Sequence, residues 1–560
     1  MPWKGLCAGS PPAARLGSIR SLIRVSLAGK AHVRHRLARK KHAKGTTRLG
    51  WRARGLMEEN NPILRLSVLR RSLILAAVVM GATLYATTLL VASTLLPQMQ
   101  GSLAATPDEI AWTTTFNILA TAIVTPMTGW LVARSGRRRV MLACVAGFTV
   151  ATYLVGQAES LETVVLWRIV QGGIGAPVIP LANAIVLDSF PRKQAGLVSS
   201  IFGMTVVLGP VIGPVFGGYL AEAYGWRWAF YMIVPAGVLA SFALWATLPY
   251  DEPGQPIPLD WTGFLALTVA IGCVQLVLSR GQRLDWYESN EIIIETIIAA
   301  LAFYVFITHS LTAKQPFLNL RLLLDRNYAL GLLLVFIYGM VNFTPIVLLP
   351  SLLQQYAGYP DSVIGEIVGF RGIGGTIGFA LTFLIGRWDP RIGMAIGFAA
   401  MVVAGLWLMS FDLNVSEAAL LWNAVLQGLA VGIIWVPLTV LTFKTLDREH
   451  LPEGMAMFHL LRNIGSSLFI SLSVAEIIRS GAMNYSRMTE MISPYNRTLQ
   501  LPESMGGFGM ETVPELAKLS GEITRQAAMI GYVNGFGLFT AASAVAILLV
   551  LLAGGRGKRA

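Results

Sequence analysis

Four charged side chains interrupt long apolar stretches of this sequence and are the residues best suited to chemistry: Arg168, Arg371, Arg462 and Glu366. A guanidinium deep in a membrane costs about 2.5–3.5 kcal/mol on insertion scales, so each arginine should face other helices or a wet cavity. Burial disfavours the charged form of a carboxylate, which would let Glu366 take up a proton on one side and release it on the other. The pattern predicts proton coupling through these residues. The alternatives are arginines that reach the interface or only hold helices together, and a glutamate that only begins a helix.

Two other acids are candidates for the same chemistry. Glu222 and Glu476 lie near the outer ends of apolar stretches, and Glu222 could instead cap a loop. Glu366 is the acid that we place clearly inside a stretch. Arg371 follows it by five residues, about 140° round a helix, so the two are not expected to form a simple ion pair.

The composition indicates what must position these residues. Of 560 residues, 54% are hydrophobic and 13% are charged, against about 25% charged residues in soluble domains. The chain is therefore expected to cross a membrane many times. Its three cysteines, Cys7, Cys144 and Cys273, have no metal-ligand spacing, and no hydrolase, kinase or nucleotide-loop motif occurs. We expect no enzyme activity, no catalytic residue, no metal and no cofactor.

The net charge of +14 comes from one segment. Residues 1–56 hold 14 Lys and Arg and no Asp or Glu, and the two signs balance in the rest of the chain. This excludes a distributed basic surface, so nucleic acid is not an expected partner. The segment could precede a true start at Met57, form a tail attracted to anionic membrane lipids, or be an organelle transit peptide. We expect residues 1–70 to be disordered or not native.

Apolar runs of about 20 residues, which cross a hydrocarbon core about 30 Å thick, predict an all-α polytopic membrane protein. Arginines such as Arg134 and Arg137 gather in alternate loops, so the positive-inside rule places both termini in the cytoplasm. We predict fourteen spanning helices, near residues 73–96, 110–132, 140–157, 163–187, 196–221, 228–249, 261–279, 292–313, 329–352, 363–386, 392–411, 419–443, 455–478 and 531–553.

Two parts of the sequence echo each other. The fourth span carries Trp167, Gln171, Gly172 and Pro180, and the twelfth carries Trp422, Gln427, Gly428 and Pro437 at nearly the same spacing. Membrane transport proteins commonly duplicate a six-helix half. We therefore predict six-helix bundles at 71–250 and 316–560, two inserted helices at 251–315, and a long outside loop at 479–530.

The fifth span contains the sequence GPVIGPVFGG. Its small residues and prolines recur about every four positions, which suits a membrane helix that packs closely against its neighbours and bends. These residues are Gly209, Pro210, Gly213, Pro214, Gly217 and Gly218. Such a helix favours a bundle with at least two arrangements.

Three motifs in order resemble those of the major facilitator superfamily. Residues 129–139, GWLVARSGRRR, resemble its loop signature, through Gly129, Arg134, Gly136 and Arg137. Residues 166–172, LWRIVQG, resemble its helix-four signature, through Arg168 and Gln171. The glycine-proline run resembles the helix-five signature of its antiporters. With fourteen spans and the long last outside loop, the chain resembles the EmrB/QacA-like branch of drug:proton antiporters.

The resemblance implies a major facilitator fold, alternating access, and proton-driven export of lipophilic, often cationic compounds across the cytoplasmic membrane. In Gram-negative hosts it also implies a periplasmic adaptor and an outer-membrane channel as partners. The alternatives are a dedicated exporter of one metabolite, such as a siderophore or an antibiotic, and a membrane sensor that does not transport.

The sequence departs from this family at two positions. Ala133 stands where the loop signature has Asp, and Thr88 stands where many relatives carry an acid in the first span. We predict that Asp188, at the cytoplasmic end of span four, pairs with Arg134 or Arg137 and latches the halves in one state; the alternative is a solvated loop charge.

Aromatic and amide side chains inside the spans are candidates for substrate contact, because they suit bulky amphipathic compounds. The same side chains could instead face lipid or fill the core. The candidates are Trp112, Phe116, Asn117, Phe336, Asn342, Phe370 and Trp435.

Overall fold

The computed structural model describes residues 67–190, 195–250, 258–314, 316–385, 389–446, 450–493, 495–496 and 512–552. Within these ranges the secondary structure is helical and contains no strand, which confirms the all-α fold class. The basic segment, residues 1–56, lies outside the described residues. Of the range 1–70 that was predicted to be disordered or not native, only residues 67–70 are described, and the first described helix begins there at Val68.

The first half of the chain contains helices α2 (Val68–Ser102), α3 (Pro107–Val124), η1 (Thr125–Met127), α4 (Thr128–Ser135), α5 (Arg137–Gln157), α6 (Leu161–Gly175), α7 (Val178–Ser189), α8 (Ala195–Tyr224), α9 (Trp226–Tyr231) and α10 (Ile233–Thr247). Spans two, four and six are each divided into consecutive shorter helices. Glycines with positive φ separate α4 from α5 (Gly136, φ 81°) and α8 from α9 (Gly225, φ 91°), a backbone region that side chains disfavour.

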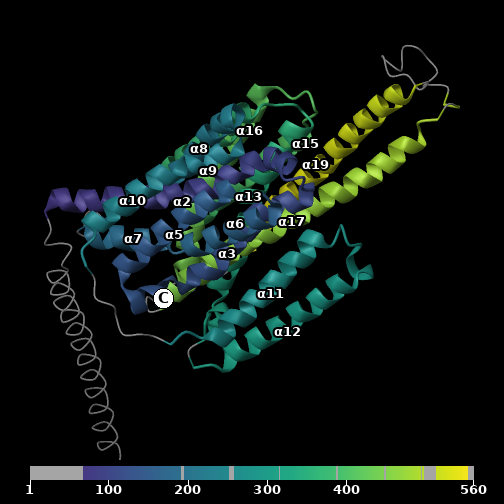
Figure 1. The fold of residues 1–560 in the computed structure, drawn as a ribbon. Helices are drawn as coiled ribbons and strands as arrows, with labels where there is room; N and C mark the ends of the chain where they lie inside the picture. The colour runs from purple at the N-terminus through teal and green to yellow at the C-terminus, as the bar shows by residue number, and fades with distance from the viewer. Residues whose placement is uncertain are drawn as a thin grey trace, which may run out of the picture. The chain divides into compact units, whose positions relative to one another are not determined.

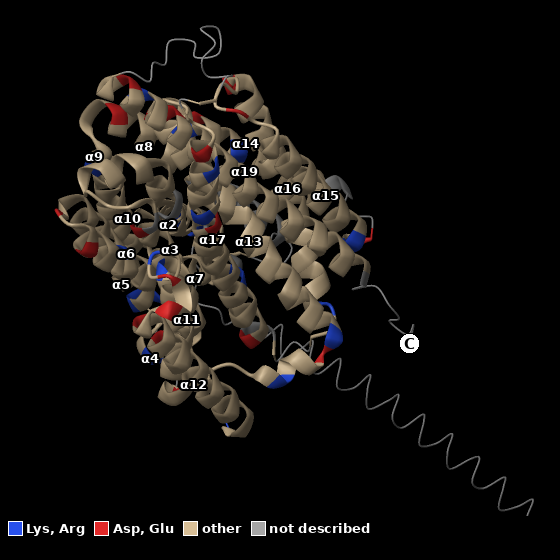
Figure 2. Ribbon diagram, turned by 90° about the vertical axis from the view of Figure 1, so that its right-hand side faces the viewer, with Lys and Arg blue, Asp and Glu red and all other residues tan. Residues whose placement is uncertain are grey.

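The remaining helices are α11 (Trp261–Arg280), η2 (Trp286–Glu288), α12 (Asn290–Thr312), η3 (Leu320–Leu324), α13 (Arg326–Gln355), α14 (Asp361–Ile385), α15 (Pro390–Met409), α16 (Glu417–Phe443), α17 (Leu451–Glu490) and α19 (Val513–Leu552). Among the residues searched, thirteen helical segments are long and apolar enough to cross a membrane. The remaining predicted span, 196–221, coincides with the thirty-residue helix α8. Figure 2 shows long uncharged stretches along the helices, with charged residues mostly toward their ends.

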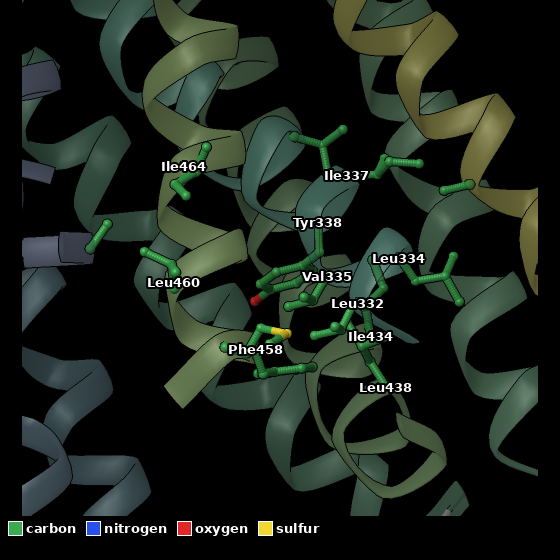
Figure 3. Packing of buried hydrophobic residues seen from close by; sticks show 14 of the residues in the cluster. Leu332, Leu334, Val335, Ile337, Tyr338, Ile434, Leu438, Phe458, Leu460 and Ile464 are labelled. Carbon is green, nitrogen blue, oxygen red and sulfur yellow. The ribbon is translucent and has the colours of Figure 1, made fainter. Parts of the chain in front are cut away.

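Helices α2, α3, α5, α6, α8 and α10 pack against one another, as do α13 to α17 and α19. The two groups meet where α8 packs on α14 (Figure 2), and where α3 packs on α17 and α2 on α13 (Figure 1). The main apolar cluster runs between α13, α16 and α17, where Tyr338, Ile434 and Phe458 interdigitate (Figure 3). The bundle boundaries given above, 71–250 and 316–560, stay a prediction.

Several helix ends lie at one end of the bundle. The side chain of Gln98 near the end of α2 donates to the carbonyl of Ala221 (3.0 Å), and Gln100 contacts Gln355 at the end of α13. The carboxylate of Glu222 near the end of α8 accepts from a backbone amide at the start of α14. We call the end that contains these residues the distal end.

Helices α11 and α12 lie side by side as a pair (Figure 1). Polar contacts join them near both ends. Asp260 caps α11 by accepting from the backbone amide of Gly263 (3.0 Å) and also contacts His309 of α12 (2.8 Å). At the other end, Arg280 of α11 pairs with Glu295 of α12 (3.4 Å). The pair packs against the two groups of helices through α11, which contacts α3 and α17.

Helices α17 and α19 contain 40 residues each, or about 60 Å of helix, twice the thickness of a hydrocarbon core. The stretch predicted as a loop at 479–530 is therefore largely helical among its described residues, because α17 continues to Glu490 and α19 begins at Val513. Tyr485 and Ser520 join the extended parts of the two helices (3.1 Å), and Asn534 of α19 donates to Ser480 at the start of the extended part of α17 (2.6 Å). Pairing with each other gives these polar helices the packing that neither has alone.

Candidate functional site

Arg168 of α6 lies fully buried among four helices. Its Nε donates to the carbonyl of Thr113 on α3 (3.0 Å) and its Nη1 to the carbonyl of Thr88 on α2 (2.9 Å). Nη1 also contacts Gln171, whose amide donates to Thr152 on α5 (2.7 Å). The guanidinium thus satisfies carbonyls on α2 and α3, and its Nη2 has no hydrogen-bond partner.

The neighbours of Arg168 are neutral. Asn117 of α3, a predicted substrate contact, donates instead to the Arg168 carbonyl (2.7 Å) and is itself buried. Tyr85 of α2 contacts the hydroxyl of Thr121 (2.8 Å) and donates to the carbonyl of Gly172 (3.2 Å). No carboxylate among the described residues forms an ion pair with Arg168.

Arg371 of α14 is buried and donates to the carbonyl of Asn342 on α13 (2.7 Å), another predicted substrate contact. Its Nε has no partner. The structure thus brings together two residues that were predicted for different roles. Among the described residues, no acid forms an ion pair with Arg371.

Arg462 of α17 lies in an aromatic cluster. Its guanidinium is 5.5 Å from the ring centre of Trp435 on α16 and donates to the amide oxygen of Asn463 (2.8 Å). Trp435 also contacts Tyr338 of α13 (ring centres 5.3 Å apart) and Phe458 (5.6 Å). A cation beside aromatic faces is a surface that can accept amphipathic molecules.

The glycines of the two echoing spans make the same kind of contact. A Cβ on Gly172 of α6 would overlap the backbone carbonyl of Asn117 on α3, and a Cβ on Gly428 of α16 would overlap that of Arg371 on α14. Each glycine therefore allows close approach of two helix backbones next to a polar residue singled out by the sequence.

Helix α8 presents small residues on two faces. On one face Gly209, Gly213 and Gly217 lie against α2, where a Cβ on Gly213 would be 3.0 Å from the Thr87 carbonyl oxygen. On the other face a Cβ on Gly218 would overlap the carbonyl oxygen of Asp361 on α14. The carbonyl oxygen of Pro214 lies where a Cβ on Gly365 of α14 would project. The side chain of Pro210 lies outside the described part.

Two predicted acids lie along this contact between α8 and α14, near the distal end. The Tyr219 hydroxyl of α8 donates to Oε1 of Glu366 on α14. The backbone amide of Ser362 on α14 donates to Glu222 of α8 (3.1 Å). We call these four residues, with the glycines between them, the α8–α14 seam. Glu476, the third candidate acid, lies half-buried on α17 and outside this seam.

The sequence analysis missed other acids inside helices. Asp361 begins α14, is buried, and contacts the Gln354 side chain; it was missed because the predicted span began at residue 363. Glu295 lies inside α12 and pairs with Arg280, so Glu366 is not the only acid inside a spanning helix. Glu295 lies within the predicted span 292–313, so the sequence already placed this acid inside an apolar run, although it was not singled out.

The loop signature lies at the junction of α4 and α5. Arg134 is exposed and its guanidinium lies 5.6 Å from the ring centre of Trp130, and Gly136 provides the turn noted above. A Cβ on Gly129 would meet open space. The side chain of Asp188 lies outside the described part, so its proposed contact with Arg134 or Arg137 stays a prediction.

The other aromatic candidates lie in different surroundings. Trp112 and Phe116 of α3 contact each other edge to face (6.3 Å between ring centres). Phe336 packs against the main apolar cluster, whereas Phe370 is 39% exposed. Of the seven predicted substrate contacts, Trp435 and Trp112 have rings close to an arginine, Arg462 and Arg283 respectively.

Comparison with known proteins gives a consistent result. Residues 61–470 match the family model of the Major Facilitator Superfamily. The multidrug export protein EmrB of Haemophilus influenzae is 30% identical over 448 residues, which cover 79% of this chain and 87% of that protein. The fatty acid resistance protein FarB of Neisseria gonorrhoeae is 30% identical over 466 residues, covering 82% and 91% respectively.

Solved structures show the same fold. A bacterial homologue of the human lysosomal transporter Spinster, in an inward-facing and occupied conformation, has a TM-score of 0.56 at 15% identity and covers 87% of this chain and 97% of that chain. The inward-open xylose transporter XylE from E. coli has a TM-score of 0.52 at 13% identity, with coverage of 82% and 95%. At these identities the likeness concerns the fold alone.

Proposed function

Because this chain belongs to the Major Facilitator Superfamily, we propose that it exports lipophilic compounds by alternating access in exchange for protons. It is a multi-pass protein of the inner membrane. The names of its relatives support export, since one is a multidrug export protein and another a fatty acid resistance protein. We place the distal end outside and both termini in the cytoplasm, following the distribution of arginines in the loops.

The observation that carries the coupling proposal is the α8–α14 seam. Helix α8 belongs to the first group of helices and α14 to the second, and carboxylates from both helices contact the other across the seam. A seam closed by carboxylates is sensitive to protonation, because a hydrogen bond to an ionised acceptor is about twice as strong as one to a neutral acceptor.

The sequence of events follows from these contacts. While Glu366 is ionised, it accepts from Tyr219 and holds α14 to α8. A proton that enters from outside neutralises Glu366, weakens this contact and favours opening of the distal end. Glu222 adds a second contact, since an anion near the N-terminus of α14 is favoured by the helix dipole. Return to the other state would release the proton to the cytoplasm.

Three arginines inside the helix groups limit the charge that a substrate can carry. Arg168, Arg371 and Arg462 bring positive charge into the two groups of helices without ion-paired acids among the described residues. This favours neutral or anionic lipophilic compounds over the cations implied by the family resemblance. Arg462 and Trp435 are the proposed contacts for such a compound. The name of FarB supports a second candidate, an exporter restricted to fatty acids or similar amphiphiles.

An adaptor and an outer-membrane channel are proposed partners if the host has an outer membrane. The α17–α19 extension, residues 479–490 and 513–528, is the proposed contact, because it continues beyond the length that a hydrocarbon core requires. Two apolar side chains of this extension are exposed, Met483 by 44% and Leu516 by 46%.

Inside-out membrane vesicles would test the proposed function. Vesicles that contain this protein should accumulate a fluorescent lipophilic acid when an inward-acid pH gradient is imposed, and should lose it when the gradient is collapsed with nigericin. Accumulation that requires ATP and survives collapse of the gradient would contradict proton-driven export.

A further inference from the structure

A cavity of about 320 Å³ lies at the distal end between α3, α11 and α17. Pro107 and Ala111 line it from α3, Val474 and Ile478 from α17, and Ser279 and Arg283 from the end of α11 and the turn after it. The three walls come from the first group of helices, the second group and the inserted pair. The volume lies at the lower end of the range for ligand pockets, about 300–1,000 Å³.

A cluster of polar side chains on α11 and α17 lies beside this cavity. Ser467 donates to the carbonyl of Thr115 on α3 (3.0 Å) and to Gln275 of α11 (2.9 Å). Gln275 in turn donates to Ser471 (2.6 Å), which lies 3.0 Å from Ser279. Ser279 and Ser471 also line the cavity, so hydroxyl groups of this cluster form part of its wall. Its wall on α17, from Ser471 to Ile478, is about 10 Å long.

The mouth of the cavity carries a cation. Arg283 pairs with Glu109 through Nη1, lies 5.7 Å from the ring centre of Trp112, and keeps 38% of its side chain exposed. A guanidinium has five N–H donors, so the pair with Glu109 leaves donors for another acceptor. The cavity therefore combines apolar walls, the hydroxyl groups of Ser279 and Ser471, and a partly exposed guanidinium.

We propose that this cavity is a second binding site, distinct from the surface at Arg462 and Trp435, for lipophilic compounds with an anionic head group. The apolar part lies between Ala111 and Val474, and the head group contacts Arg283. This rests on the proposed function in that the ligand is an exported compound. A membrane phospholipid shares the same chemistry, an apolar tail and an anionic head, and the test separates the two sources.

Photo-crosslinking in lipid nanodiscs tests the proposal. The probe is a naphthalenesulfonate that carries a diazirine, and labelled peptides are mapped by mass spectrometry. We expect labels in α3 near Ala111 and in α17 between Ser471 and Ile478. Ala475→Phe, which fills the cavity from α17, should lower this labelling about tenfold, as expected for a loss of about 1.4 kcal/mol.

Controls distinguish binding in the cavity from contact of the probe with the outer surface of α17. Leu472 of the same helix is 40% exposed, and Leu472→Phe should leave labelling unchanged. Ala111→Leu narrows the cavity from the opposite wall and should act like Ala475→Phe. Arg283→Gln should weaken labelling by the sulfonate but not by an uncharged analogue of the probe.

Two results would overturn the proposal. One is equal labelling of the cavity peptides in the protein with and without Ala475→Phe. The other is labelling of those peptides by a diazirine phosphatidylglycerol in the nanodisc that excess sulfonate does not displace, because the cavity would then hold lipid. Export in vesicles is measured separately: if the unmodified protein exports and the cavity peptides stay unlabelled, the cavity proposal fails while the proposed function stands.

Discussion

Replacing Gly218 by alanine should open the α8–α14 seam. The added Cβ would overlap the Asp361 carbonyl oxygen and lie 3.2 Å from its carbon and 3.4 Å from the Cα of Gly365. All three atoms belong to backbone, so no side-chain rotation relieves the overlap, and α8 must separate from α14. Overpacking of this kind costs about 1–3 kcal/mol.

This cost falls on the distally closed state alone, because the two helices part when the seam opens. A bias of about 1–3 kcal/mol shifts an equilibrium between two states by about 5- to 150-fold. Gly217→Ala is a matched control. Its Cβ would be 2.7 Å from Val91 of α2, in the same group of helices, so both states carry its cost equally.

Accessibility of the seam measures the shift. A cysteine at Ser362, in a background without Cys7, Cys144 and Cys273, should react with a membrane-impermeant maleimide in proportion to the open population. We expect Gly218→Ala to raise the labelling rate at least about fivefold and Gly217→Ala to leave it unchanged. An unchanged rate in folded Gly218→Ala protein, or an equal rise in the control, would refute the reasoning.

Two further predictions concern stability. Arg168→Lys should lower the free energy of unfolding by about 1.5–3 kcal/mol, because an ammonium cannot bridge the carbonyls of α2 and α3 as the planar guanidinium does; an unchanged melting temperature in detergent would contradict this. At Asp260, burial opposes the charge, but hydrogen bonds from the amides of Gly263 and Phe317 and from His309 hold the carboxylate pKa below its usual range. A lowered pKa in the folded state means that this stabilisation is present at neutral pH and is lost as the pH falls through the folded pKa, below about pH 4. Asp260→Asn should therefore lower the melting temperature at pH 7, and its difference from the unmodified protein should shrink in acid; a difference independent of pH would argue against the assignment.

The positions of the spans and the close packing of α8 could be predicted from the sequence. Apolar runs of the required length are a local signal, and the glycine spacing of Gly209, Gly213 and Gly217 directly reflects the face that meets α2. The contact of Gly218 with α14 could not be predicted, since its partner lies more than a hundred residues away.

Residues whose role depends on tertiary partners were harder to predict. Asn117 has the chemistry of a substrate contact; its amide nitrogen donates to the Arg168 carbonyl and its amide oxygen has no partner among the described residues, so that role stays a prediction. Gln275 lies in an apolar span and was not predicted to have a role, although its side chain joins α11 to α17 by donating to Ser471. The continuation of α17 to Glu490 was missed because these residues lack the apolar run that marks a span, whereas residues 514–528 of α19 do have helical spacing in the sequence.

Substrate-induced proton release tests the central claim most directly. Purified protein in proteoliposomes with an imposed pH gradient would be given a panel of lipophilic compounds, beside Glu366→Gln and, as a control away from the seam, Glu476→Gln. The account predicts that several compounds discharge the gradient with the unmodified protein and with Glu476→Gln, and that Glu366→Gln binds them but releases no protons. Full proton release by Glu366→Gln would contradict it.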